Sequence, residues 1–220
     1  MSKAKRRRAY DGTKRQEAAK ARQERVIEVA TRLFAERGYA ETTVDMIAAE
    51  AEVAVPTVYA SFGSKRGLLS QILDRLVTGE SRPRPILQTA RARDVLDEPD
   101  PRRALALFAE HMTEIQARVG PLFEVMKHAA RTDAEVSELH ARAQRSRYQN
   151  LEAVARMLDD RGGLRPGLTV ASAARTIWVI ASPETRQMLE AHAGWSADDY
   201  RTWLTDTLLA ALLAPEPPSP

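Results

Sequence analysis

The sequence predicts an all-α protein, and three observations support this prediction. Alanine, leucine, glutamate and arginine, which favour helices, dominate the 220 residues. Apolar residues recur every three or four positions in successive segments, whereas no stretch alternates apolar and polar residues as a half-buried strand does. Glycine and proline stand between these segments, where they end helices. Because 44% of the residues are hydrophobic, the chain can bury a core in one or two domains.

The composition also excludes several classes of protein. The chain has no cysteine, so it has no disulfide scaffold, thiolate metal site, iron–sulfur cluster or cysteine nucleophile. Its longest nearly uncharged apolar stretches, 177–182 and 208–215, are much shorter than the about 20 residues that span a bilayer. No apolar h-region of a signal peptide follows the N-terminus. We therefore expect a cytoplasmic protein that does not enter a membrane.

The N-terminal segment is strongly basic. Residues 1–25 contain ten lysines and arginines and three acidic residues, although the net charge of the whole chain is only +3. Residues 2–16 have few apolar side chains and no helical or strand period, so residues 1–20 are predicted to form a disordered basic arm. Such an arm either binds a polyanion or serves as a solubilising tail.

The first two helices are expected at about 18–37 and 43–51. The first has an apolar face at helical spacing, and Gly38 follows it with the conformational freedom that a helix end requires. The hydroxyls of Thr42-Thr43 suit the N-cap of the second helix. The apolar face of the second helix is narrow, so this helix should be short.

Two further helices follow after a turn. Pro56 lacks an N–H and is favoured in the first turn of a helix, so the third helix should begin at about Val55 or Pro56. Gly63 ends this helix, and Ser64 is a candidate cap for the next one. The fourth helix is amphipathic and should reach about Gly79.

The domain boundary is expected near 80–100. Proline-containing stretches at 81–85 and 97–101 enclose a poorly patterned connection there. Beyond it, glycines and prolines divide the chain into predicted helices at 101–119, 121–131, 133–161, 168–191, which Ser182-Pro183 interrupts, and 196–213, which Ser196 caps. The predicted domains are therefore 21–80 and 81–214, and a disordered tail follows at 215–220.

A helix-turn-helix gives the most specific functional signal. Two short helices joined by a three- to four-residue turn place a recognition helix in the major groove of DNA. The runs 30–39 (ATRLFAERGY) and 42–69 (TTVDMIAAEAEVAVPTVYASFGSKRGLL) resemble the N-terminal domain of the TetR (tetracycline-repressor) family of transcriptional regulators. The resemblance covers about 25–78 and departs from the family pattern at Glu52, Ala54 and Pro56.

The resemblance implies a homodimeric repressor that a small-molecule effector releases from a palindromic double-stranded DNA operator. It implies a three-helix DNA-binding domain followed by a helical domain for effector binding and dimerisation. A regulator that responds to a protein partner or to no ligand, and a helical adaptor that does not bind DNA, remain alternatives. The sequence contains no catalytic constellation or cofactor fingerprint, so neither an enzyme nor a cofactor is expected.

The expected DNA contacts fall into two groups. By the resemblance, Tyr59 and Lys65 bind phosphates, and the hydroxyl of Thr43 either does the same or only caps its helix. The expected base readers share the third helix with the core-facing residues: Val55, Pro56, Thr57, Ala60 and Ser61. None of these is arginine, asparagine or glutamine, so specificity should depend on thymine methyl contacts, hydroxyls, DNA shape and the basic arm.

The C-terminal domain provides weaker candidates. Apolar residues at helical positions could line an effector pocket or belong to the ordinary core: Phe108, Met112, Phe123, Met126, Tyr148 and Trp178. The two C-terminal helices, at 168–191 and 196–213, are predicted to form a dimer interface as a four-helix bundle with those of a second subunit. The last helix contributes an apolar stripe to it, with packing on its own domain as the alternative: Tyr200, Trp203, Leu204, Leu208, Ala211 and Leu212. The four histidines show no metal-binding spacing, so no metal site is predicted.

Overall fold

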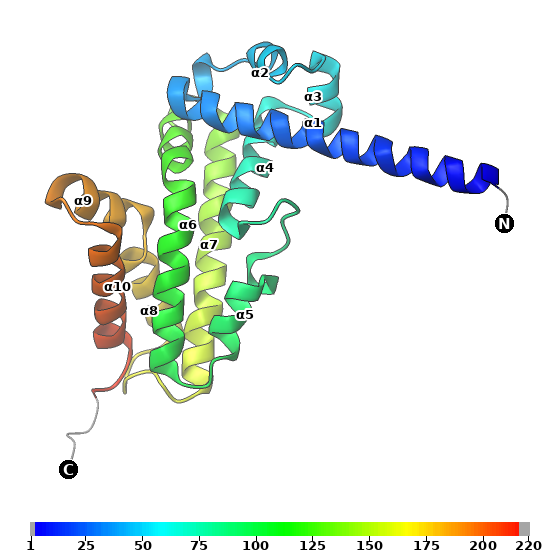
Figure 1. The fold of residues 1–220 in the computed structure, drawn as a ribbon. Coiled ribbons are helices and arrows are strands. Elements are labelled where there is room, and N and C mark those ends of the chain that lie inside the picture. The colour runs from blue at the N-terminus through cyan, green and yellow to red at the C-terminus, as the bar shows by residue number, and fades with distance from the viewer. Residues whose placement is uncertain (1–2, 216–220) are drawn as a thin grey trace. The chain divides into compact units, whose positions relative to one another are not determined.

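The computed structural model describes the backbone of residues 3–215 and the side chains of residues 16–215 (Figure 1). This part of the chain is helical, without a named strand, and an isolated antiparallel bridge joins Leu164 and Leu213. The predicted all-α class is therefore confirmed. The helices are α1 Lys3–Glu41, α2 Val44–Glu50, α3 Val55–Phe62, α4 Lys65–Thr78, the 3-10 helix η1 Ile86–Gln88, α5 Ala90–Asp97, α6 Pro101–Ala129, α7 Ala134–Asp160, α8 Val170–Ile180, α9 Pro183–Ala193 and α10 Ala197–Leu212.

The chain forms two compact units that do not follow each other in sequence. Unit 1 contains the residues up to Leu73 together with Glu124–Ser137, and unit 2 contains Asp74–Phe123 and the residues from Glu138 onward. The turn between α6 and α7 therefore belongs to the same unit as α1, α2 and α3.

Helix α1 begins much earlier than predicted. Residues 3–20 are helical, so the expectation of a disordered arm is wrong for them. The segment lacks an apolar face, but its alanines, lysines, arginines, glutamine and glutamate have high intrinsic helix propensity. The helical geometry breaks at Gly38, whose φ of 80° and ψ of 169° lie in a region open to glycine, as the predicted end near residue 37 requires.

The turn between α2 and α3 is built from local hydrogen bonds. The Oγ1 atom of Thr43 accepts a bond from the amide of Met46 at 3.1 Å and caps α2, as predicted. At the other end, the amide of Val53 bonds to the carbonyl of Ala48 at 2.9 Å and that of Glu52 to Ala49 at 3.2 Å. This is the Schellman pattern, and Glu52 occupies its left-handed position with a φ of 56°.

Helices α3 and α4 meet at a glycine. The Oγ atom of Ser64 accepts a bond from the amide of Gly67 at 2.9 Å, so Ser64 caps α4 as predicted. A Cβ at Gly67 would lie 2.1 Å from the carbonyl oxygen of Phe62, so a larger residue would push the two helices apart. The core of unit 1 beneath this junction includes Val26, Ala30, Phe34, Ile47, Val58, Phe62, Leu68, Leu69 and Ile72.

Two regions after α4 differ from prediction. The connection predicted to be irregular contains η1 and α5, and the Oγ1 atom of Thr89 caps α5 at the amide of Ala92. The two helices predicted to be separated at Gly120-Pro121 are one helix, α6. Pro121 removes one helical hydrogen bond, but the apolar face continues at helical spacing through it: Val119, Leu122, Phe123 and Met126 are all buried.

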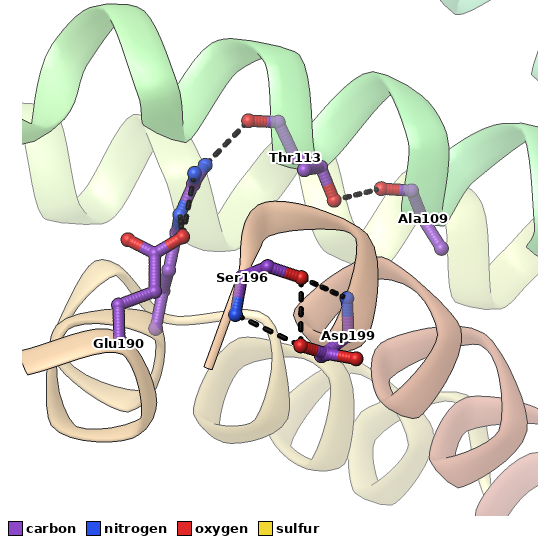
Figure 2. Close-up of polar contacts among 6 residues, drawn as sticks. Ala109, Thr113, Glu190, Ser196 and Asp199 are labelled. Carbon is purple, nitrogen blue, oxygen red and sulfur yellow. Dashed lines mark hydrogen bonds and ion pairs between the residues drawn. The ribbon is translucent and has the colours of Figure 1, made fainter. Parts of the chain in front are cut away.

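The last four helices agree with the predicted breaks. Helix α7 ends before Gly162-Gly163, and Ser182 caps α9. Ser196 begins α10 with a capping box, in which its hydroxyl accepts the amide of Asp199 at 3.1 Å and its own amide donates to Asp199 Oδ2 at 2.9 Å (Figure 2). The hydrogen bonds from Ser196 hold the pKa of the Asp199 carboxyl below its usual value.

The apolar stripe of α10 is the centre of unit 2. Tyr200, Leu204, Leu208 and Leu212 have no exposed surface in the single chain, where they pack with residues of α6, α7 and α8. These four predicted interface residues therefore pack on their own domain, and in the single chain they offer no exposed surface to a second subunit. Trp203 and Ala211, the other two predicted interface residues, are half-buried against the same core.

Candidate nucleic-acid interface

Helix α3 presents a polar and weakly apolar face to solvent. Val58 and Phe62 are 1% and 6% exposed, and their burial fixes the rotation of the helix. Pro56, Tyr59 and Ala60 are consequently exposed, and 49% of the Tyr59 surface is accessible. A large exposed aromatic residue that carries a hydroxyl suits a contact with the DNA backbone.

Thr57 and Ser61 lie on the side of α3 that faces α1. Both are half-buried and line a shallow hollow with four residues of α1: Ala19, Arg22, Gln23 and Val26. We call these six residues the α1–α3 hollow. Val55, the remaining predicted base reader, is also half-buried. The predicted base readers therefore do not share one exposed face, because Thr57 and Ser61 turn toward α1.

Thr43 is exposed at the start of α2. Because its Oγ1 atom accepts the Met46 amide, its hydroxyl hydrogen stays available for an acceptor such as a phosphate oxygen. The predicted capping role is confirmed, and the geometry permits the predicted backbone contact.

The ammonium of Lys65, a predicted phosphate contact, binds the backbone of its own chain. Its Nζ atom donates to the carbonyl oxygen of Tyr39 at 2.9 Å and to that of Thr42 at 3.0 Å. It also lies 4.2 Å from the centroid of the Tyr39 ring, a cation–π arrangement. Burial lowers the pKa of the Lys65 ammonium. Two of its three donors thus connect the start of α4 to the end of α1 and to the residue that follows it, a contact that the local sequence pattern does not reveal.

The same corner of unit 1 contains acidic residues from the α6–α7 turn. Burial, followed by the charges of Asp133 and Glu135, raises the pKa of the Tyr39 phenol to about 12. Glu135 also forms an ion pair with Arg66 at 3.6 Å. Tyr39 is therefore neutral at physiological pH and acts as a packing residue, with its ring 5.5 Å from that of Phe34.

Unit 2 contains only part of the predicted effector pocket. Phe108 and Phe123 are buried in unit 2, and Met112, Tyr148 and Trp178 are half-buried there. Met126 is also buried but belongs to unit 1. The structure therefore does not bring all six predicted residues together in one unit.

A buried polar cluster lies beside Trp178. The carbonyl oxygen of Ala181 accepts bonds from Gln116 Nε2 at 2.7 Å and from Arg147 Nη2 at 2.8 Å, and Nη2 also donates to the carbonyl of Trp178. Within the described part of the chain, Nε and Nη1 of Arg147 and Nε1 of Trp178 are buried without a hydrogen-bond partner. Burial lowers the pKa of Arg147 to about 10. We call Gln116, Arg147 and Trp178 the Ala181 cluster; no sequence motif marks it.

A second buried arginine connects α9 to α6. Arg186 donates from Nη1 to the carbonyl of Thr113 at 2.6 Å and forms an ion pair with Glu190 at 2.8 Å. Figure 2 labels these two partners, Thr113 and Glu190. Arg186 therefore has both a counterion, Glu190 one turn along α9, and a backbone acceptor on α6.

Residues 26–72 match the family model for bacterial regulatory proteins of the tetR family. This match includes α2, α3 and most of the apolar residues that form the core of unit 1. The chain contains a TetR-family DNA-binding domain. TetR-family regulators act by binding DNA rather than by catalysis, and the matched segment contains α2 and α3 in full.

Solved structures resemble almost the whole chain. NalD from Pseudomonas aeruginosa, the secondary repressor of the MexAB-OprM multidrug efflux pump, is 21% identical with a TM-score of 0.68, covering 87% of this chain and 95% of NalD. A proposed transcriptional regulator from Saccharomonospora viridis, solved with choline, is 20% identical with a TM-score of 0.65, covering 88% of this chain and 98% of that one. A proposed TetR-family regulator from Rhodococcus sp. is 15% identical with a TM-score of 0.68, covering 87% and 98%. These similarities show a common fold, including the helical second half.

No curated relative matches the chain. Among the described residues, no helix has the length and apolar character that crossing a membrane requires. The same residues contain no group of three histidine, aspartate or glutamate side chains that could bind a metal ion.

Proposed function

We propose that this TetR-family regulator is a homodimeric repressor whose helix α3 enters the major groove of a palindromic operator. The observation that supports this proposal is the exposed face of α3, where Pro56, Tyr59 and Ala60 project from a helix that Val58 and Phe62 anchor in the core. Thr43 caps α2, the helix before α3, and provides a hydroxyl for the DNA backbone. We assign DNA binding to unit 1, including the basic α1.

The proposed dimer uses surfaces of unit 2 other than the buried stripe of α10. Val179 of α8 and Met188 of α9 are large apolar residues that are 57% and 56% exposed. Exposed apolar side chains on adjacent helices are typical of surfaces that a second subunit covers. Two-fold symmetry would place two copies of α3 in successive major grooves, about 34–36 Å apart.

We infer that a small-molecule effector binds in unit 2 and weakens operator binding. The choline complex of the Saccharomonospora viridis protein shows that one structural relative binds a small molecule. In this chain, half-buried Met112, Tyr148 and Trp178 provide apolar surface, and the Ala181 cluster provides buried donors without partners. Buried unsatisfied donors favour a ligand or ordered water that accepts their hydrogen bonds.

Selection from a randomised DNA pool tests the proposed function. We expect the full-length protein to enrich an inverted repeat and to bind it much more tightly than unrelated DNA, in a complex with two protein chains per site. If the protein binds all DNA alike, the proposal fails; if it binds no DNA, the adaptor without DNA binding is favoured.

A compound screen on the protein–operator complex tests the effector. A compound that raises the melting temperature of the free protein and releases the operator supports a ligand-responsive repressor. If no compound changes operator binding but a protein from the same cell reverses it, the result supports the alternative of a regulator that responds to a protein partner.

A further inference from the structure

The recognition helix lacks the side chains that read bases most strongly. Arginine distinguishes guanine, and asparagine or glutamine distinguishes adenine, through paired hydrogen bonds in the major groove. Helix α3 contains none of these residues, and its exposed positions are Pro56, Tyr59 and Ala60. A repressor that selects one operator with this helix alone must depend on weaker contacts.

Helix α1 brings the missing residue types to the edge of α3. Ala19, Arg22, Gln23 and Val26 are spaced as one face of a helix, and Val26 is 2% exposed, which anchors this face to the core. Arg22 and Gln23, one turn earlier, are exposed and line the α1–α3 hollow together with Thr57 and Ser61. Within the described part of the chain, neither Arg22 nor Gln23 has an ion pair or a side-chain hydrogen bond.

The positions on α3 support the same arrangement. Thr57 and Ser61 are one turn apart, so their hydroxyls form the opposite wall of the hollow. Both side chains are small, and a base edge that reaches α3 at this side comes within reach of longer side chains from α1. The guanidinium of Arg22 and the amide of Gln23 are long, uncommitted and positioned by a helix rather than by a loop.

We propose that Arg22 and Gln23 of α1 are specificity-determining residues that read bases beside Thr57 and Ser61. This inference rests on the proposed insertion of α3 into the major groove. Arg22 donates two hydrogen bonds to O6 and N7 of a guanine, and Gln23 pairs with N6 and N7 of an adenine. The α1–α3 hollow is thus a composite reading surface, with the small residues on α3 and the long ones on α1.

Three variants of the full-length protein separate base reading from attraction to phosphates. In Arg22→Lys the charge stays but the planar fork is lost, so overall affinity changes little while the preference for one base falls by a factor of about 5 to about 100. Gln23→Ala should relax the preference at a neighbouring position without changing the salt dependence. Lys20→Ala is the control, because Lys20 is exposed on the same helix but does not line the hollow. It should weaken binding to all sequences alike.

The measurement is binding of each variant to a set of operators that differ by one base pair, at two salt concentrations. Unchanged base preferences in Arg22→Lys and Gln23→Ala overturn the inference while the proposed function stands, because the wild type still selects its operator. In a fourth variant, Arg22→Ala, a uniform loss of affinity with the base preferences of the wild type also overturns the inference and makes Arg22 a phosphate contact. If the wild type selects no DNA sequence, the proposed function itself is wrong.

Discussion

Glu52 is strained in the turn between α2 and α3. It is the one non-glycine residue in the described part of the chain with a positive φ, 56°. A left-handed conformation costs a residue with a Cβ about 1–2 kcal/mol. Glycine avoids this cost, but its larger entropy in the unfolded chain offsets part of the gain. We expect Glu52→Gly to raise the free energy of unfolding by about 0.5–1 kcal/mol, measured by urea denaturation. Glu52 also forms an exposed ion pair with Arg25 at 3.0 Å, so Arg25→Ala is the control for the loss of that pair. A lower free energy of unfolding in Glu52→Gly would contradict the prediction.

Lys65 is expected to stabilise the DNA-binding unit through the backbone. Replacing it with methionine leaves the carbonyls of Tyr39 and Thr42 without the donor that they share. Hydrogen bonds to a charged group contribute about 1.5–3 kcal/mol, and partial exposure of this site places the expected loss near the lower end. Arg66→Met removes the same charge from the neighbouring position, whose ion pair with exposed Glu135 is longer, at 3.6 Å, and should change the free energy of unfolding much less. Equal losses in thermal or urea unfolding would show that Lys65 acts only as a charge.

His111 predicts a pH dependence of stability. The side chain is 7% exposed in α6, and burial lowers its pKa from the ordinary value of 6.5. The charges of Arg118 and Arg91 lower this pKa further, and those of Glu114 and Asp94 raise it. The unfolded chain therefore binds a proton before the folded chain does, so stability is fully present above pH 6.5 and falls as the pH decreases toward the folded pKa. We expect His111→Gln to flatten this loss in urea titrations just below pH 6.5. A variant that retains the full pH slope would exclude His111 as its source.

At the scale of the helix, α1 consists of a part that packs in the core and a basic extension before it. Val26 is the first core residue among the described side chains, and residues 2–15 are strongly basic in sequence. Deleting residues 2–15 should leave the free energy of unfolding nearly unchanged. It should make the slope of log affinity against log salt less steep, by about 0.9 for each phosphate that the extension neutralises. Binding titrations at several salt concentrations measure this, and an unchanged slope would show that the extension does not contact DNA.

Helix positions were predictable wherever a local signal decides them. Thr43, Ser64 and Ser196 cap helices through bonds to amides three residues away, and such spacing is visible in a sequence. Pro121 misled the prediction because its local cost was weighed above the apolar face that continues through α6. The extension of α1 was missed because helix propensity without an apolar face gives no periodic signal.

Site residues were harder to predict because their roles depend on contacts distant in sequence. The motif placed Tyr59 at the exposed face of α3, but not Lys65 on the carbonyls of Tyr39 and Thr42, which are 26 and 23 residues away. The α1–α3 hollow joins residues more than 30 positions apart and has no sequence pattern of its own. A resemblance transfers positions along the chain, whereas these contacts depend on how α1 packs against its neighbours.

At the scale of the whole molecule, burial in the single chain decides which surfaces remain for a second subunit. Leu204 and Leu208 have no exposed surface, so Leu204→Glu should unfold unit 2 rather than yield a folded monomer. Val179 and Met188 are more than half exposed, so glutamate at these positions is tolerated by the monomer but not by an apolar subunit contact.

The double variant Val179→Glu, Met188→Glu is therefore expected to be folded and monomeric. A monomer presents one copy of α3 instead of two linked copies, so its affinity for a palindromic operator should fall by at least about 100-fold, because the second site no longer has a high effective concentration. Light scattering gives the molar mass, circular dichroism the helix content, and a binding titration the affinity. Gln149→Glu is the control, because Gln149 is an exposed polar residue of α7 and should leave all three measurements unchanged. A double variant that remains a dimer with full operator affinity would place the subunit contact on a different face of unit 2.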